Sequence, residues 1–285
     1  MCMWFITTHY TCGKVLETLK SEQIEAQLEA LTKRKYSVAK SNSLIQQTAT
    51  NLSLNEQRFI LIALSKIQKE DTIDKQYSIS FEEFCNILNI EKSKGGYLHK
   101  RIKKYLKKLA DTSIWYYDNQ NKEDRLIRWL SNIKIKDSVI YYSFDRSISD
   151  YIYNLKEYYT TYELWNVLLL KTKNSIEFYE FIKSLANLNI APSFEIDVLQ
   201  AKFNINYKTY GEFKRSFLTR CIEEVNNKTD LKVKVNEIKE GRKVVKLEFV
   251  INILENKELM DKYVSVESAI QLKQNKPLLE HKATL

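Results

Sequence analysis

The sequence predicts an α+β fold made of two tandem winged helix-turn-helix domains, the second a pseudo-duplicate of the first. In each half, helical periodicity of apolar residues comes first and the alternating pattern of a β-hairpin follows. Apolar residues of the two halves correspond at a constant distance in the sequence. Leu218 follows Ile102 by 116 residues, and Ile222 follows Leu106 by the same 116 residues. A repeat at this distance indicates an internal duplication.

The length of 285 residues is sufficient for two domains with separate cores. We divide the chain into an N-terminal extension (residues 1–35), a first winged-helix domain (36–155), a second (156–255) and a polar C-terminal tail (256–285). The extension carries an imperfect stripe of Leu and Ile among polar residues, which predicts a loosely attached helix or a contact with a partner.

The first predicted domain opens with a helix that a capping box starts. Ser53 and Glu56 have the spacing at which each side chain can satisfy a backbone N–H near the other, and apolar residues continue to Ile67. A strand at 77–80 and helices at 81–88 and 97–110 follow. Strands are predicted at 113–117, 126–135 and 139–144, and the polar tract 118–124 forms a hairpin tip between the first two.

The second predicted domain repeats this order of elements. Helices are predicted near 163–171 and 175–188, and a short helix covers 196–203. A longer helix, about 210–226, turns six apolar residues inward. The alternating segments 231–235 and 245–251 then form a hairpin whose turn lies at Glu240 and Gly241.

Composition argues against an enzyme. The chain has 5 glycines and no glycine-rich phosphate loop, and its 3 histidines lie too far apart in sequence to form a metal-binding motif. We therefore expect no catalytic residue, no metal and no cofactor. The 4 cysteines lack CxxC spacing, and Cys85 and Cys221 stand among apolar residues, which predicts small core side chains in a reducing cytoplasm. No membrane span or leader is recognisable, so we expect no membrane association.

The charge is basic, with 45 Lys and Arg against 36 Asp and Glu, a net charge of +9. This surplus favours a polyanionic partner without distinguishing nucleic acid from an anionic membrane. In the first domain it concentrates between residues 92 and 108, where eight basic residues and no acidic one occur. Solvated helix faces usually alternate Glu with Lys, because i,i+4 pairs relieve repulsion. We predict DNA contact through Lys94, Lys100, Arg101, Lys103, Lys104 and Lys107, with a solvated face as the alternative.

In the second domain, basic residues lie at the start of the longest helix, where recognition helices contact bases. Arg215 has the guanidinium that can donate two hydrogen bonds to guanine, and Ser216 and Thr219 can reach bases or phosphates. The turn after residue 239 is the expected wing tip or else an ordinary hairpin end. The predicted DNA-binding residues of this domain are Lys208, Lys214, Arg215, Ser216, Thr219, Arg220, Arg242 and Lys243.

Aromatic runs at 115–117, 141–142 and 151–153 have two interpretations. One is a platform on which the bases of single-stranded nucleic acid stack. Their spacing also fits strand and helix packing, and we predict packing.

Four groups of residues, in this order, resemble the iteron-binding plasmid replication initiators, the initiator Rep proteins of theta-replicating plasmids in Gram-positive hosts. They are residues 36–45 with 52–58, residues 163–171 with 175–180, residues 213–231, and residues 239–244. The most telling reads FKRSFLTRCIEEVNNKTDL and runs from Phe213 to Leu231. Together the groups span roughly residues 36–252.

The resemblance implies a tandem winged-helix protein that binds repeated sites, called iterons, in the double-stranded DNA of a plasmid origin. It also implies that monomers help to open an A·T-rich segment and to recruit the host initiator DnaA and the replicative helicase, while dimers repress the initiator's own gene. On this basis the second recognition helix and wing carry Lys214, Arg215, Thr219, Arg220, Arg242 and Lys243. The first basic helix carries Lys100, Arg101, Lys103 and Lys104.

Three other functions are alternatives to an iteron-binding initiator. Membrane-surface binding would need bulky apolar residues exposed opposite the basic face of the helix at 97–110, and a winged-helix core would bury those residues. A rolling-circle initiator cuts DNA with a tyrosine and a metal held by paired histidines, and no two histidines of this chain lie within 80 residues of each other. A winged-helix transcriptional regulator, acting as an autorepressor without an initiator role, would share the physical features of an initiator. Binding to several repeats in one origin, and support of plasmid replication, distinguish the initiator from the regulator.

Overall fold

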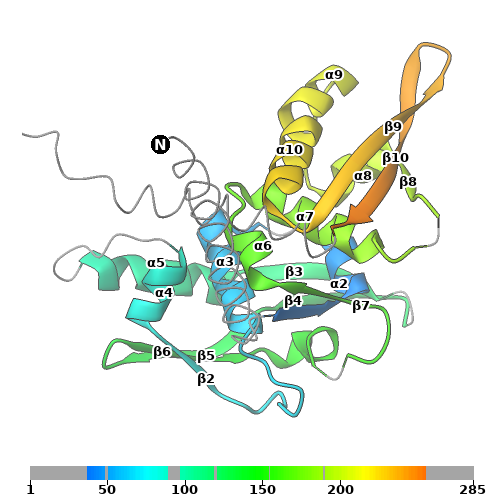
Figure 1. Cartoon of the computed structure of the whole chain (residues 1–285). Helices are drawn as coiled ribbons and strands as arrows, with labels where there is room; N and C mark the ends of the chain where they lie inside the picture. The colour runs from blue at the N-terminus through cyan, green and yellow to red at the C-terminus, as the bar shows by residue number, and fades with distance from the viewer. Residues whose placement is uncertain are drawn as a thin grey trace, which may run out of the picture. The chain divides into compact units, whose positions relative to one another are not determined.

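The computed structural model describes residues 37–48, 51–88, 97–118, 121–153, 155–188 and 190–254, without the side chains of residues 83 and 86–88 (Figure 1). These residues belong to one compact unit, Tyr36–Leu254. The predicted N-terminal extension and C-terminal tail lie outside the described residues. No helix of the described part is long and apolar enough to cross a membrane.

The first half of this unit, residues 37–153, mixes short helices with three pairs of adjacent strands. In chain order its elements are β1 (Ser37–Ser41), α2 (Asn42–Gln47), α3 (Leu54–Leu64), β2 (Tyr77–Ser80), α4 (Phe81–Leu88), α5 (Tyr97–Asp111), β3 (Ser113–Asp118), β4 (Glu123–Arg128), β5 (Leu130–Lys136), β6 (Val139–Phe144) and the 3₁₀ helix η1 (Arg146–Tyr151).

The second half, residues 155–254, ends in a long hairpin that extends beside a long helix (Figure 1). Its elements are β7 (Tyr159–Glu163), α6 (Leu164–Leu168), α7 (Lys173–Leu185), β8 (Ser193–Glu195), α8 (Ile196–Lys202), α9 (Tyr210–Phe213), the π-helical segment η2 (Lys214–Leu218), α10 (Thr219–Lys228), β9 (Leu231–Glu240) and β10 (Lys243–Ile253).

Both halves have the same sheet topology, which confirms the predicted pair of winged helix-turn-helix domains. The strand order is β2-β6-β5 in the first half and β8-β10-β9 in the second. In each sheet a short strand comes first, helices follow, and the last strand of the returning hairpin lies in the middle. This hairpin is the wing, and the helix before it is the recognition helix. The first half differs by one insertion, the hairpin β3–β4.

The capping box starts α3 as predicted. The helix begins at Leu54, and the N–H of Ser53 donates to the Glu56 carboxylate at 2.7 Å. It ends at Leu64, three residues before the predicted end. The hydroxyl of Ser65 donates to the carbonyl of Ile62 at 2.8 Å, a local hydrogen bond that competes with continuation of the helix.

The single strand predicted at 126–135 is wrong, because this segment forms two strands with different partners. Strand β4 pairs with β3, and β5 pairs with β6. Trp129 and Leu130 are adjacent in sequence and both are buried. Since side chains of a continuous strand alternate between its faces, two adjacent buried residues mark the break.

Strands β1 and β7 connect the two halves and were not predicted. They pair antiparallel with Ala39 opposite Thr161 at the centre of the ladder. In Figure 1, β1 is the dark blue strand beside β7. Each strand has only five residues, and polar residues dominate both. Sequence periodicity therefore offers no apolar run that would reveal them.

Aromatic side chains pack against one another in the core of each half. In the first half the ring of Phe59 lies 5.3 Å from that of Phe84 and 5.8 Å from that of Tyr142, centroid to centroid. In the second, the rings of Phe203 and Phe217 are 4.8 Å apart. Edge and tilted contacts of this kind add to the free energy that burial of the rings supplies.

The two cysteines of the described region are buried core residues, as predicted. Burial raises the pKa of the Cys221 thiol to about 12, so this group stays neutral at physiological pH.

The prediction that the aromatic runs serve packing is correct for Tyr116, Tyr151 and Tyr153, which are buried. It is wrong for two others, because Trp115 is 66% and Tyr117 46% exposed. Alternate positions of β3 face solvent, and these two residues occupy them.

Candidate nucleic-acid interface

The recognition helix of the second half is continuous from residue 210 to residue 228 but changes its winding once. Segment η2 is π-helical and lies between α9 and α10. Buried residues recur at every fourth position of this helix, namely Phe213, Phe217, Cys221 and Val225. An α-helix has 3.6 residues per turn, so a four-residue repeat drifts around it, and a π turn absorbs the extra residue.

The same four-residue spacing keeps the outer face of this helix aligned. Arg215 and Thr219 are four residues apart and both are exposed, as is Arg220. Ser216, four residues before Arg220, is half-buried. Among the described residues, no acidic side chain forms an ion pair with Arg215 or Arg220, so neither guanidinium is neutralised there. This outer face can therefore meet an anionic ligand directly.

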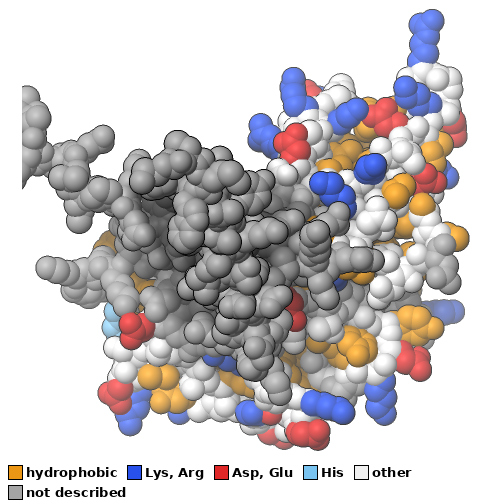
Figure 2. Space-filling model, viewed as in Figure 1, with side chains coloured by type: hydrophobic (Ala, Val, Ile, Leu, Met, Phe, Trp, Pro, Cys, Tyr) orange, Lys and Arg blue, Asp and Glu red, His pale blue; other side chains and the backbone are white. Residues whose placement is uncertain are grey.

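The wing of the second half places two basic residues at its tip. Gly241 has φ = 60°, and it is the first residue of the two-residue loop between β9 and β10. Turns of this kind favour glycine there, because its backbone accepts positive φ without strain. Arg242 and Lys243 are exposed beside it, and Lys208 is exposed before the recognition helix. Figure 2 shows Lys and Arg side chains gathered over α9, α10 and this hairpin, with a few acidic ones among them.

Lys214 differs from its neighbours because it is already paired. Its ammonium lies 2.7 Å from the carboxylate of Glu237 on β9, which also accepts a hydrogen bond from the Tyr210 hydroxyl at 2.6 Å. These hydrogen bonds, first that of Lys214 and then that of Tyr210, lower the pKa of Glu237. The cluster joins the start of the recognition helix to the wing strand.

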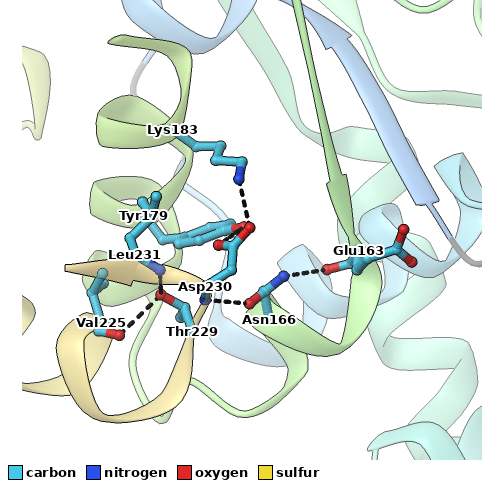
Figure 3. Close-up of polar contacts among 8 residues, drawn as sticks. All are labelled: Glu163, Asn166, Tyr179, Lys183, Val225, Thr229, Asp230 and Leu231. Atoms are coloured by element: carbon cyan, nitrogen blue, oxygen red, sulfur yellow. Dashed lines mark hydrogen bonds and ion pairs between the residues drawn. The ribbon is translucent and has the colours of Figure 1, made fainter. Parts of the chain in front are cut away.

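A second polar network fixes the other end of the recognition helix on α7 (Figure 3). Asp230, between α10 and β9, accepts a hydrogen bond from the Tyr179 hydroxyl at 2.9 Å and pairs with Lys183 at 2.5 Å. Its own N–H donates to the Asn166 side chain at 2.9 Å. The hydroxyl of Thr229 donates to the carbonyl of Val225 and closes the helix. The position of the helix is thus set at both ends.

The recognition helix of the first half, α5, presents three exposed lysines, Lys100, Lys103 and Lys104, which we call the lysine face. None of the three forms an ion pair with another described residue. Arg101 is half-buried, and its guanidinium lies over the ring of Tyr105 at 6.0 Å. Lys107 is exposed and pairs with Asp111 at 2.9 Å. Predicted Lys94 lies outside the described residues.

Lys108 is basic but has a structural role. Its ammonium lies 2.8 Å from the carboxylate of Glu56, a side chain that is only 3% exposed. Although burial raises the pKa of Glu56, hydrogen bonds from Lys108 and Ser53 outweigh this and lower it. The ion pair attaches α5 to α3.

The wing of the first half also carries basic residues, which are not among the predicted DNA-binding residues. Asp137 and Ser138 form the turn between β5 and β6, with φ of 49° and 57°. Lys134 and Lys136 are exposed on β5 just before this turn. Positive φ at both positions is the signature of a type I′ hairpin. The Asp-Ser pair lacks the glycine that usually marks this turn, so the available signal was the pair of strand-like segments on either side of it.

The described residues contain no group of three or more His, Cys, Asp or Glu side chains that could hold a metal ion.

Comparison with known proteins identifies the family. A family model described as "Initiator Replication protein, WH1" matches residues 37–183, more than half of the chain, and one described as "Initiator Rep protein, WH2" matches residues 195–251. The chain belongs to the initiator replication protein family. The resemblance inferred from the sequence is thereby confirmed. The predicted domain boundary at residues 155 and 156 stays a prediction.

Individual relatives of this initiator are distant. An uncharacterised 27.6 kDa protein of Escherichia coli is 23% identical over 224 residues, 73% of this chain and 92% of that protein. A crystal structure of the Pi initiator protein in complex with iteron DNA matches with a TM-score of 0.65 and 21% identity, over 78% of this chain and 98% of that one. At this identity the likeness shows that the two proteins share a fold.

Proposed function

We propose that this protein initiates replication of a plasmid by binding repeated duplex sites, the iterons, in the plasmid origin. The observation that carries the proposal is the presence of both winged-helix domains of the initiator family in one chain, each with an exposed basic recognition helix. The Pi initiator, which has the same fold, is crystallised with iteron DNA. This supports duplex DNA as the ligand.

The two recognition helices would divide the work of binding. Arg215 and Arg220 carry planar guanidinium groups, which can read guanine through two parallel hydrogen bonds. The lysine face of α5 offers point charges better suited to phosphates, which position a protein without reading sequence. We therefore assign base recognition mainly to the second half. The predicted contacts at Lys208, Lys214, Ser216, Thr219, Arg242 and Lys243 belong to the same surface.

Binding would serve the steps that follow in initiation. We propose that monomers on the repeats help to open an A·T-rich segment and to recruit DnaA and the replicative helicase in the bacterial cytoplasm, and that dimers repress the initiator's gene. Support for these steps is family membership. We further propose that the protein itself does not cut DNA.

Footprinting on the plasmid origin, combined with a replication assay, tests the proposal. The expected result is protection of several similar repeats and maintenance of a plasmid that carries only this origin and the intact gene. Protection of a single promoter site, with no support of replication, would identify a transcriptional regulator. Family membership favours the initiator over that alternative.

A further inference from the structure

Two ammonium groups join residues 37–153 to residues 155–254 across a contact that we call the seam. Lys40 on β1 is 6% exposed, and its Nζ lies 2.5 Å from the carboxylate of Glu180 on α7. Lys202, the last residue of α8, donates to the carbonyl of Thr48 at 2.6 Å. Each of these contacts has one partner in each half.

Helix α3 adds two more polar contacts to the seam. The side-chain amide of Gln57 donates to the carboxylate of Glu177 on α7 at 2.6 Å. The guanidinium of Arg58 donates to the carbonyls of Leu168 and Leu170, at 3.1 and 2.7 Å. The seam is therefore held by directional contacts as well as by the β1–β7 ladder.

Charged residues are a costly way to fill such a contact. Removing an ammonium from water is energetically unfavourable, and apolar residues of similar volume often hold two surfaces together equally well. A hydrogen bond, however, weakens steeply when its angle changes, whereas apolar surfaces can slide over one another. A polar seam therefore specifies one relative geometry, a role for which buried polar groups are known in other proteins.

The helices that form the seam contacts are also attached to the recognition helices. Helix α3, with Gln57, is attached to α5 through the ion pair between Glu56 and Lys108. Helix α7, with Glu180, is attached to the end of α10 through the contacts of Asp230 (Figure 3). A chain of packed elements thus runs from one recognition helix through the seam to the other.

We propose that Lys40 and Lys202 are positioning residues, which set the separation and angle of the two recognition helices and so the spacing of the two half-sites that the protein accepts. The proposal rests on the proposed function in one respect only, that both halves contact one DNA site. The residues themselves are not expected to touch DNA.

The test uses two seam variants of the full chain and one matched control. Lys202→Met removes one ammonium, and Lys40→Met with Glu180→Gln removes an ion pair while leaving an acceptor for the Tyr162 hydroxyl. Lys75→Met is the control, because it also removes an ammonium from an ion pair, that of Lys75 with Asp71 at 2.5 Å, which lies within the first half and outside both the seam and the recognition helices. Urea denaturation verifies that all three are folded.

The first readout is the dependence of affinity on half-site spacing. The wild-type protein selects its site from a random duplex library, and duplexes with one to four base pairs added between the half-sites are then compared. One base pair rotates a half-site by about 35°, so wild type and control should lose roughly tenfold in affinity for the first added pair. The affinity of the seam variants should fall less than about threefold for the same added base pair. Their affinity for a duplex that contains only the half-site of the second half should equal that of wild type.

The second readout does not involve DNA. Spin labels at Lys134→Cys and Lys234→Cys, exposed positions in the two halves, report the distance distribution between them after Cys2 and Cys12 are replaced by Ser. A narrow distribution in wild type and control, broadened in the seam variants, supports the proposal. Folded seam variants with the wild-type spacing profile or the wild-type distribution would overturn it. If broadening occurs but wild type selects no DNA, the positioning role stands and the proposed function fails.

Discussion

Replacing Lys202 by methionine should change how stability depends on pH. Burial lowers the pKa of the Lys202 ammonium from 10.5 to about 8, although Glu177 and Glu180 oppose the shift and Lys40 adds to it. In the unfolded chain the group has its ordinary pKa. Between these two values the unfolded state holds a proton that the folded state has lost, so the free energy of unfolding rises with pH in this window.

The magnitude follows from the two pKa values. At 1.36 kcal/mol per pKa unit, the complete shift corresponds to at most about 3 kcal/mol, fully present above pH 10.5 and lost as the pH falls through 8. Between pH 7 and pH 9, Lys202 should add about 1.4 kcal/mol to the free energy of unfolding. Lys202→Met should remove this increment, because methionine has no charge to lose.

Urea denaturation of wild type and Lys202→Met at pH 7, 8 and 9 measures this difference. Titrating groups that do not interact with Lys202 contribute equally to both proteins, so the difference between the two curves reports on Lys202 and its charged neighbours Glu177, Glu180 and Lys40. Lys69→Met removes an exposed ammonium and controls for the change in net charge. If wild type and Lys202→Met differ by the same free energy at pH 7 and pH 9, the assigned burial of the Lys202 ammonium is wrong.

Four further outcomes are expected. Affinity for duplex DNA should fall with salt at a log–log slope of about −7, if roughly eight phosphates are neutralised, and a slope shallower than about −3 would exclude contact along both helices. Arg215→Ala should weaken binding to the cognate repeat by about 1–3 kcal/mol and change binding to random duplex little. Removing the charges of the lysine face should weaken binding to both kinds of DNA. Competition binding measures the two effects, and an equal loss of specificity from both changes would refute the assignment of base recognition to the second half. Glu237→Gln should tighten random-duplex binding roughly threefold in filter binding by releasing Lys214, and no change would show that this ion pair does not compete with DNA. Incubation with Mg²⁺ and a supercoiled origin plasmid should leave the plasmid unnicked, and a carboxylate metal site would be revealed by cleavage.

The elements that were predictable from sequence are those specified by local patterns. The capping box at Ser53 and Glu56 and the apolar stripe of α5 depend on residues three or four positions apart, and both are found as predicted. The alternation of the β9–β10 wing is similarly local, and its turn lies at Gly241 as expected. The clustering of basic residues identified the exposed face of α5, because no acidic residue interrupts it.

What the sequence did not reveal depends on partners far away in the chain. Strand β1 is defined by pairing with β7, more than a hundred residues later, so its own five residues contain too little information. The ion pair of Lys214 with Glu237 arises only when the wing folds back beside the recognition helix. The π turn of η2 accompanies a four-residue apolar repeat, which is visible in the sequence but also fits the ordinary helix predicted there.

The antiparallel β1–β7 ladder also bears on the origin of the chain. Strand β1 is the first element of the first half, and β7 is the first element of the second half, in which the elements follow the same order. The two strands pair antiparallel, with Ala39 opposite Thr161 at the centre of the ladder. Two separate copies of one winged-helix unit, meeting through the same strand around a twofold axis, would form this ladder. In the present chain the β1–β7 ladder has the local symmetry of such a contact, with both strands in one covalent chain. A fusion of two tandem genes would have preserved the subunit contact unchanged, and each half could then acquire its own features, the β3–β4 hairpin in one and the π turn in the other.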